Sequence, residues 1–214
     1  MTTFEKETDM KQIKNIVFDQ GKVLLDFTVQ KVLSPYFPAP DDFALAKTAV
    51  FDSGDWEKID MGMLKEIDAL DRWLEKLPQR LHAATVEFFE HWYQHMTPVE
   101  GMLELVQTLK KNGYRCYLLS NTSPRYYTFY RTVEVMRLLD GYIVSAVHRL
   151  YKPDAAIYQR LFDTYGLDPE ECFFVDDVAE NIDAGMRLGM RGFQFVDFDV
   201  AGLKKALLAE GIRL

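Results

Sequence analysis

The sequence predicts an α/β fold in which a doubly wound parallel sheet carries an inserted, all-helical segment. Five short runs are rich in β-branched and aromatic residues and mostly apolar without alternation, the pattern of strands buried on both faces of a parallel sheet. Amphipathic helical stretches separate the later runs, which implies right-handed βαβ units. Residues 28–97 break this alternation, because they contain helical patterns and no convincing strand.

The chain is long and apolar enough to bury a sizeable core. It has 214 residues, of which 48% are hydrophobic, and this suits one domain or one domain with a modest insertion. We therefore expect residues 1–27 and 98–214 to form the sheet domain and residues 28–97 to form a helical cap.

Charge, leader and cysteine content restrict the partners and the compartment. The net charge of −8 and the pI near 5.1 argue against a nucleic-acid partner, which would require a basic face. Residues 1–15 lack the apolar segment of a signal peptide, and no stretch approaches the roughly 18 apolar residues of a membrane span. Cys116 and Cys172 lie in apolar runs, which favours buried free thiols. We expect a soluble cytoplasmic protein, monomeric or homodimeric, with no membrane partner.

The first strand is predicted in the segment IVFDQGKVLLDF at residues 16–27. Its apolar run ends abruptly on Asp19, and the chain then turns at residues 20–22. Taken alone, Asp19 is equally compatible with a turn-forming role.

The remaining strands end on polar side chains. The runs are YRCYLLSN (114–121), GYIVSAV (141–147), CFFVDD (172–177) and GFQFVDF (192–198). Helical stretches that stop at Gly113 and Gly166 precede the runs at 114–121 and 172–177. In doubly wound sheets, ligands bind beyond the carboxyl ends of the strands. The polar residues that fall at this end are Asp19, Ser120, Asp176 and Asp177.

The insertion is predicted to contain two long amphipathic helices. They are MLKEIDALDRWLEKL (63–77) and PQRLHAATVEFFEHWYQHM (78–96), preceded by a proline-rich loop at 33–40. We interpret the aromatic residues of the second helix, Trp92 among them, as core of the insertion and not as a substrate site. His91 and His95 mimic a metal pair, but a solvated or interfacial face is the favoured interpretation.

The polar residues at the strand ends predict phosphoryl chemistry on a metal. Asp19 with the pair Asp176-Asp177 makes a hard oxygen cluster suited to Mg²⁺. Lys152 and the side chains of Ser120-Asn121 would add a cation and donors that neutralise a phosphoryl group. A carboxylate in such a site can attack phosphorus and form an aspartyl-phosphate, which water then cleaves. Asp19 is the natural candidate for this nucleophile.

Four ordered motifs carry a family resemblance. They are Asp19-Gln20-Gly21-Lys22-Val23, then YLLSN ending in Ser120-Asn121, then Lys152-Pro153, then FFVDD with Asn181 beyond it. In this order, with a helical insertion after the first, the chain resembles the haloacid dehalogenase-like hydrolase superfamily, whose core is Rossmann-like. It is similar to the glucose-1-phosphatase-like branch, and the segment WEKIDMGML is similar to the cap opening of the sugar-phosphatase branch.

The resemblance implies a role for each matching residue. Asp19 would be the nucleophile, Ser120 with Asn121 would bind phosphate, and Lys152 would stabilise the intermediate. The metal would be held by the acids of the first and last motifs and by one backbone carbonyl. These ligands are Asp19, Asp177, the carbonyl of Gly21, and Asp176 either directly or through water.

One position departs from the family pattern. Most phosphatases of the superfamily carry a second Asp where this chain has Gly21, and that Asp protonates the leaving group, a form of help worth about 10²- to 10⁴-fold in rate. The first hypothesis is a Mg²⁺-dependent phosphatase for a small phosphorylated metabolite, with sugar phosphates as a family-level suggestion. The second is a catalytically weak phosphate-binding or protein-interaction module, and the third is a metal-free haloacid dehalogenase.

Overall fold

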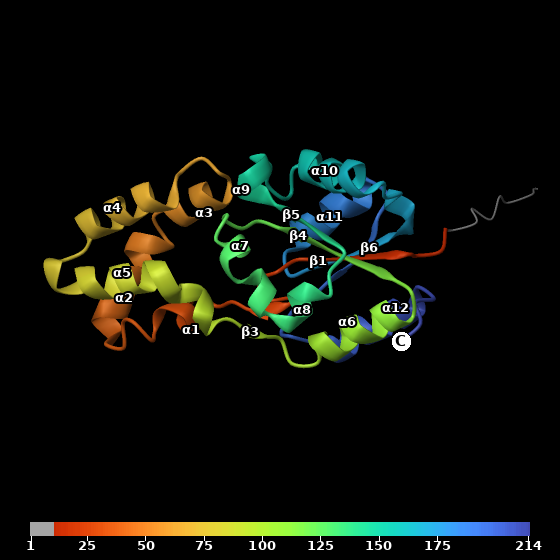
Figure 1. Ribbon diagram of the computed structural model, residues 1–214, viewed down its shortest axis with the longest axis horizontal. Coiled ribbons are helices and arrows are strands. Elements are labelled where there is room, and N and C mark those ends of the chain that lie inside the picture. The colour runs from red at the N-terminus through yellow and green to blue at the C-terminus, as the bar shows by residue number, and fades with distance from the viewer. Residues whose placement is uncertain (1–10) are drawn as a thin grey trace, which may run out of the picture.

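The computed structural model describes residues 11–214, and a five-stranded parallel sheet forms its centre (Figure 1). The strand order is β5-β4-β1-β6-β7. All neighbouring strands are parallel, and Phe18 at the end of β1 lies opposite Leu118 of β4 and Val175 of β6. The strands are β1 (Asn15–Phe18), β4 (Arg115–Ser120), β5 (Gly141–Val144), β6 (Cys172–Asp176) and β7 (Arg191–Gln194). The predicted doubly wound sheet is confirmed, with a strand in each of the five runs. The run at 141–147 turns into helix α9 at Ser145, and the run at 192–198 is a strand only as far as Gln194.

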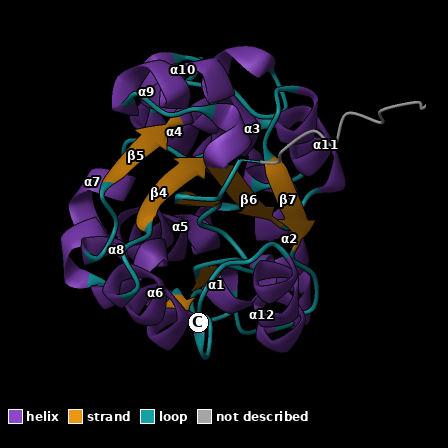
Figure 2. Cartoon of the chain, turned by 90° about the vertical axis from the view of Figure 1, so that its right-hand side faces the viewer, coloured by secondary structure: helices purple, strands orange, loops and turns teal. Residues whose placement is uncertain are grey.

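Helices cover both faces of the sheet (Figure 2). Successive residues of β1 explain the two layers, because side chains alternate across a strand. Val17 packs with the apolar sides of α10 (Ala155–Tyr165) and α11 (Ala179–Arg187), whereas Ile16 and Phe18 belong to the core under α6 (Met102–Lys111) and α12 (Val200–Ala209). Shorter helices complete the domain: α7 (Tyr126–Phe129), η3 (Tyr130–Thr132), α8 (Glu134–Arg137), α9 (Ser145–His148) and η4 (Pro169–Glu171).

The insertion folds into helices at one end of the molecule (Figure 1). The helix predicted over 63–77 is α4, and the one predicted over 78–96 is α5 flanked by two 3₁₀ turns. An aromatic cluster that includes Trp56, Trp73 and Phe88 holds the insertion together. The elements are α1 (Val29–Leu33), α2 (Pro40–Val50), α3 (Asp55–Asp60), α4 (Glu66–Lys76), η1 (Gln79–Leu81), α5 (His82–His91) and η2 (Trp92–His95).

A two-stranded antiparallel ribbon joins the insertion to the sheet domain. It pairs β2 (Leu25–Asp26) with β3 (Thr97–Pro98). The Lys31 ammonium binds both strands, 2.6 Å from Asp26 Oδ2 and 2.6 Å from Thr97 Oγ1. This ribbon was not predicted, because two residues are too few to show a strand pattern, and β3 begins one residue before the expected domain boundary.

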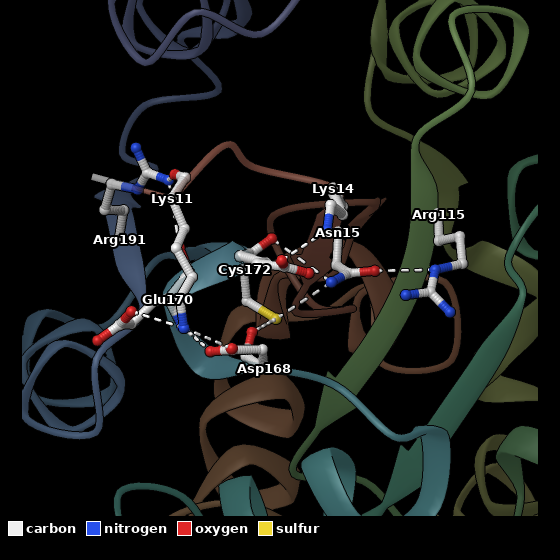
Figure 3. Close-up of polar contacts among 9 residues, drawn as sticks. Lys11, Lys14, Asn15, Arg115, Asp168, Glu170, Cys172 and Arg191 are labelled. Carbon is white, nitrogen blue, oxygen red and sulfur yellow. Dashed lines mark hydrogen bonds and ion pairs between the residues drawn. The ribbon is translucent and has the colours of Figure 1, made fainter. Parts of the chain in front are cut away.

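Ion pairs and hydrogen bonds close the amino-terminal edge of the sheet (Figure 3). Lys11 Nζ lies 2.7 Å from Asp168 Oδ2 and 2.9 Å from Glu170 Oε2. Arg115 Nε donates to Asn15 Oδ1 at 3.0 Å, which links β4 to β1. The segment that enters β1 is therefore fixed on the turn that precedes β6. The carboxyl ends of the strands lie at the opposite end of the sheet.

Two further expectations concern the cysteines and the membrane. Cys116 and Cys172 are buried free thiols, as predicted, and burial raises the pKa of each to about 12. From residue 11 onward, no helix is long and apolar enough to cross a membrane. The expectation that the chain has no signal peptide concerned residues 1–15. Of these, residues 1–10 lie outside the described residues.

Candidate functional site

A cavity of about 260 Å³ lies between the carboxyl ends of the strands and the inserted helices. In Figure 1, β1 runs towards the insertion, so the end of this strand faces it. Residues from the first three predicted motifs and Asp177 of the fourth meet in this cavity, together with side chains from the insertion. The lining residues include Asp19, Gly21, Lys22, Phe27, Trp56, Asp60, Trp92, Ser120, Asn121, Thr122, Tyr151, Lys152, Asp177 and Asn181.

Asp19 is held at the mouth of the central strand. Its backbone N–H donates to the Val175 carbonyl at 2.9 Å, which continues the β1–β6 ladder one residue further. The chain then closes a tight loop, since the Gln20 carbonyl accepts from the N–H groups of Leu24 and Leu25. Burial raises the pKa of Asp19 to about 6, although the Lys152 ammonium opposes the shift. The carboxyl group is therefore largely ionised at neutral pH.

Lys152 lies at the centre of the charged groups and is almost fully buried, with a 2% exposed surface. Its ammonium donates to Asp19 Oδ1 at 2.8 Å and to Asp176 Oδ2 at 2.6 Å. Burial alone would lower the pKa of Lys152, but the two carboxylates outweigh it and the pKa is raised. The lysine therefore stays charged and joins two strands of the sheet.

Asn121 fixes the backbone of Lys152. Its Oδ1 accepts from the Lys152 N–H at 2.8 Å, and its Nδ2 donates to the Lys152 carbonyl at 3.0 Å. The side-chain amide is thus engaged on both sides, while the predicted role of Asn121 was to bind phosphate. That role stays a prediction, and the geometry gives Asn121 a positioning contact.

Asp176 is the most deeply enclosed of the three acids, with no exposed surface. Its Oδ2 accepts from Lys152, and its Oδ1 accepts from the Val178 N–H and from Asn181 Nδ2, both at 2.9 Å. Three donors therefore orient this carboxylate. Asn181, which lies beyond the fourth motif in the sequence, therefore contacts this acid.

Asp177 faces the cavity more openly. Its Oδ2 lies 3.0 Å from Lys22 Nζ, and Lys22 adopts a left-handed backbone with φ of 58° at the turn after Asp19.

Gly21 also lines the cavity. A Cβ atom built on Gly21 would meet nothing closer than Phe27, at 3.8 Å. Steric crowding at the Cβ position therefore does not require a glycine there.

The three acids suit a magnesium ion. One carboxylate oxygen from each of Asp19, Asp176 and Asp177 lies within 4.8 Å of the others. Oxygen-only ligands from carboxylates are what Mg²⁺ prefers. Lys152 and the more exposed Lys22 bring two positive charges to three crowded carboxylates, so a further cation would relieve the remaining repulsion. The residues present thus fit the metal that the sequence predicted.

Ser120 ends β4 beside these groups. It is buried with a 2% exposed surface and lines the same cavity. Thr122 follows, and its N–H donates to the buried Ser145 Oγ at 2.8 Å, which fixes the loop. The predicted phosphate-binding serine is therefore on the same cavity wall as Asp19 and Lys152.

Sequence reasoning missed the side chains that the insertion contributes. Asp60, Trp56 and Trp92 line the cavity from the helical side. Trp92 was interpreted as a core residue, and it does belong to the hydrophobic core. It also lines the cavity, which that interpretation did not include. The available signal was the cap-opening segment WEKIDMGML, which contains both Trp56 and Asp60.

The fold and the sequence together define the class of protein. The family model for haloacid dehalogenase-like hydrolases matches residues 13–189. The chain belongs to this family of hydrolases.

Particular relatives are similar over most of their length. The chain is 27% identical to a sesquiterpene phosphatase of Aspergillus oryzae over 187 residues, 86% of this chain and 90% of the relative. It is 29% identical to D-ribitol-5-phosphate phosphatase of Bacteroides thetaiotaomicron over 194 residues, 85% of this chain and 91% of that one. A family enzyme of Bacteroides thetaiotaomicron, solved in complex with magnesium and inorganic phosphate, has the same fold. Its TM-score is 0.67 at 21% identity, over 89% of this chain and 98% of that one.

Proposed function

We propose that the protein is a Mg²⁺-dependent phosphatase that hydrolyses a small phosphate monoester through an aspartyl-phosphate on Asp19. The observation that carries the proposal is the contact of 2.8 Å between Lys152 Nζ and Asp19 Oδ1 at the floor of the cavity. A buried cation on one carboxylate oxygen keeps the group ionised and leaves Oδ2 to attack. The two phosphatases among the relatives support the same chemistry.

Each residue has a defined part in the proposed reaction. Asp19 attacks phosphorus, a bond from its oxygen to phosphorus forms, and the bond from phosphorus to the ester oxygen breaks. Lys152 and Ser120 stabilise the phosphoryl oxygens during both steps. Water then attacks phosphorus, which releases inorganic phosphate and restores the Asp19 carboxylate. Bound magnesium, held by Asp19, Asp177, Asp176 and the Gly21 carbonyl, would supply further positive charge to the phosphoryl group.

The dimensions of the cavity support a small substrate. Its volume of about 260 Å³ is just below the range of about 300–1,000 Å³ that is common for small-molecule sites. We propose that the inserted helices, residues 28–97, act as a cap on the sheet domain and exclude water during phosphoryl transfer. A sugar phosphate or a comparable small ester suits this space.

The test is phosphate release from a panel of sugar phosphates, nucleotides, acyl phosphates and p-nitrophenyl phosphate. Each compound is assayed with Mg²⁺ or EDTA, using the wild type, Asp19→Asn and the surface control Asp52→Asn. We expect release that requires Mg²⁺, is abolished in Asp19→Asn and is unchanged in the control. Release by Asp19→Asn at the wild-type rate, or no release from any compound, would refute the proposal.

A further inference from the structure

The proposed reaction leaves one proton unassigned. The ester oxygen that departs must be protonated unless it is stable as an anion, and Gly21 has no side chain to supply the proton. General acids contribute about 10²- to 10⁴-fold to such steps. The following inference rests on the proposed phosphatase function and concerns the residue that fills this role.

We propose that Asp60 of α3 is the general acid that protonates the leaving oxygen. Asp60 lines the same cavity as Asp19 and Lys152, but it comes from the inserted helices. A phosphoryl group on Asp19 would have its leaving group directed away from the sheet, because the attacking and leaving oxygens are roughly in line. The insertion forms that side of the cavity, so a donor on α3 is on the leaving-group side.

The end of α3 is anchored to the sheet domain, which fixes where Asp60 lies. Ser145 Oγ donates to the Asp60 carbonyl at 2.5 Å and also accepts from the Thr122 N–H at 2.8 Å. Gly62, at φ 68°, then passes so close to α9 that a Cβ there would lie 2.3 Å from the Ala146 carbonyl oxygen. The backbone of Asp60 is therefore held by Ser145 of α9, which also fixes the loop that follows Ser120.

The surroundings of Asp60 favour its protonated form. Burial raises the pKa of Asp60 well above its ordinary value, and the carboxylates of Glu66 and Asp19 add to this, while a hydrogen bond from the Trp56 side chain opposes it. Asp60 also faces Glu57 on its own helix.

Tyr151 and Lys152 also line the cavity, and the pKa of Tyr151 is raised to about 12, chiefly by burial, so this phenol stays neutral. Two carboxyl groups in one cavity, with the proton favoured on Asp60 and with Asp19 paired to the Lys152 ammonium, are the arrangement expected of an acid and a nucleophile.

The proton balance of the step is simple. As the Asp19 oxygen bonds to phosphorus, the electron pair of the breaking ester bond moves to the leaving oxygen. That oxygen takes the proton of the Asp60 carboxyl and departs as a neutral alcohol. The Asp60 carboxylate then accepts a proton from the water that attacks the aspartyl-phosphate, which returns Asp60 to its starting state.

This assignment names a substrate class. An acyl or nitrophenyl phosphate has a leaving group that is stable as an anion and requires no proton, so Asp60 would be superfluous for it. The alkoxide of an alcohol requires one. The physiological substrate is therefore a phosphate ester of an alcohol, whose carbon skeleton contacts Phe27, Trp56 and Trp92 on the same wall as Asp60.

The experiment compares leaving groups in Asp60→Asn. We measure kcat with Mg²⁺ for alkyl phosphates and for p-nitrophenyl phosphate. The matched control is Asp52→Asn, an exposed carboxylate that precedes the same helix and does not line the cavity. We expect Asp60→Asn to lower kcat for alkyl phosphates about 10²- to 10⁴-fold, while p-nitrophenyl phosphate and the control change little. Retained p-nitrophenyl phosphate turnover also demonstrates that the variant is folded.

Equal losses for both leaving-group classes in a folded variant would overturn the assignment, as would no loss for alkyl phosphates. If Asp60→Asn does not fold, Asp60→Ser is compared in the same way. A wild type with no activity on any compound would instead refute the phosphatase proposal itself, so the two failures are distinguishable.

Discussion

Replacing Lys152 by Met tests the electrostatic core of the site most severely. The ammonium contacts Asp19 at 2.8 Å and Asp176 at 2.6 Å, and the lysine side chain is only 1% exposed. Met fills a similar volume but carries no charge. The substitution therefore leaves two adjacent buried carboxylates without their shared cation.

The size of the loss follows from the burial of the ion pairs. Removing one partner of a buried ion pair costs about 3–5 kcal/mol. We expect Lys152→Met to lower the free energy of unfolding by about 4 kcal/mol in EDTA. For a chain of this size that corresponds to a decrease in Tm of about 8–16 °C.

The assay is urea unfolding at pH 7 with EDTA and again with Mg²⁺. A metal ion replaces part of the missing charge, so the variant should bind Mg²⁺ more tightly and its deficit should narrow. Lys47→Met, which removes an exposed ion pair with Asp52, is the control and should change the free energy of unfolding by less than about 1 kcal/mol. A Lys152→Met deficit below about 1 kcal/mol in EDTA would refute the proposed coupling of the three groups.

Three other predictions follow from the same structure. Asp55→Asn should destabilise the protein by about 1–3 kcal/mol at pH 7, because Asp55 is buried and lies 2.8 Å from Lys76. Burial opposes the ion pairs of Asp55, but the pairs prevail and its pKa is lowered below 3.8. Their contribution is thus present above pH 4 and lost as pH falls through the lowered pKa, so urea curves of wild type and variant should converge in acid; a constant gap would contradict this. Adding Gly21→Asp to Asp60→Asn should restore part of the lost alkyl-phosphate turnover, since a Cβ atom at position 21 meets nothing closer than 3.8 Å, and no recovery for any alkyl ester would argue against that geometry. Saturating Mg²⁺ at about 100 times its Kd should stabilise the wild type by about 2.7 kcal/mol, and a Tm unchanged by Mg²⁺ would contradict the metal site.

The arrangement of the sheet could be predicted because its signals are local. Each buried strand is a run of apolar residues that ends on a polar residue, as at Ser120 and Asp176. Because the strands are parallel, these polar residues meet at one edge of the sheet. The three acids and Lys152 were therefore predicted as neighbours. The 2.8 and 2.6 Å contacts of Lys152 depend on a loop whose path Asn121 fixes, and no local pattern encodes such a pairing.

The contribution of the insertion to the cavity could not be predicted, because it too depends on pairings that no local pattern encodes. Asp60 lies in the cap-opening segment, outside both predicted helices. Its approach to the cavity depends on the turn at Gly62 and on Ser145, which is far from Asp60 in the sequence. Trp92 has the pattern of a core residue, and it is one, yet its edge also lines the cavity. Amphipathic periodicity identifies the buried face of a helix but not which part of that face borders a ligand.

The most direct test of the central claim is to detect phosphate on Asp19. Wild-type protein is mixed with Mg²⁺ and its best substrate, quenched in acid during turnover and digested for mass spectrometry. The account predicts one additional phosphoryl group on the peptide that contains Asp19, and none on the Asp19→Asn peptide. Phosphate release with no phosphorylated peptide, together with an active Asp19→Asn variant, would contradict it.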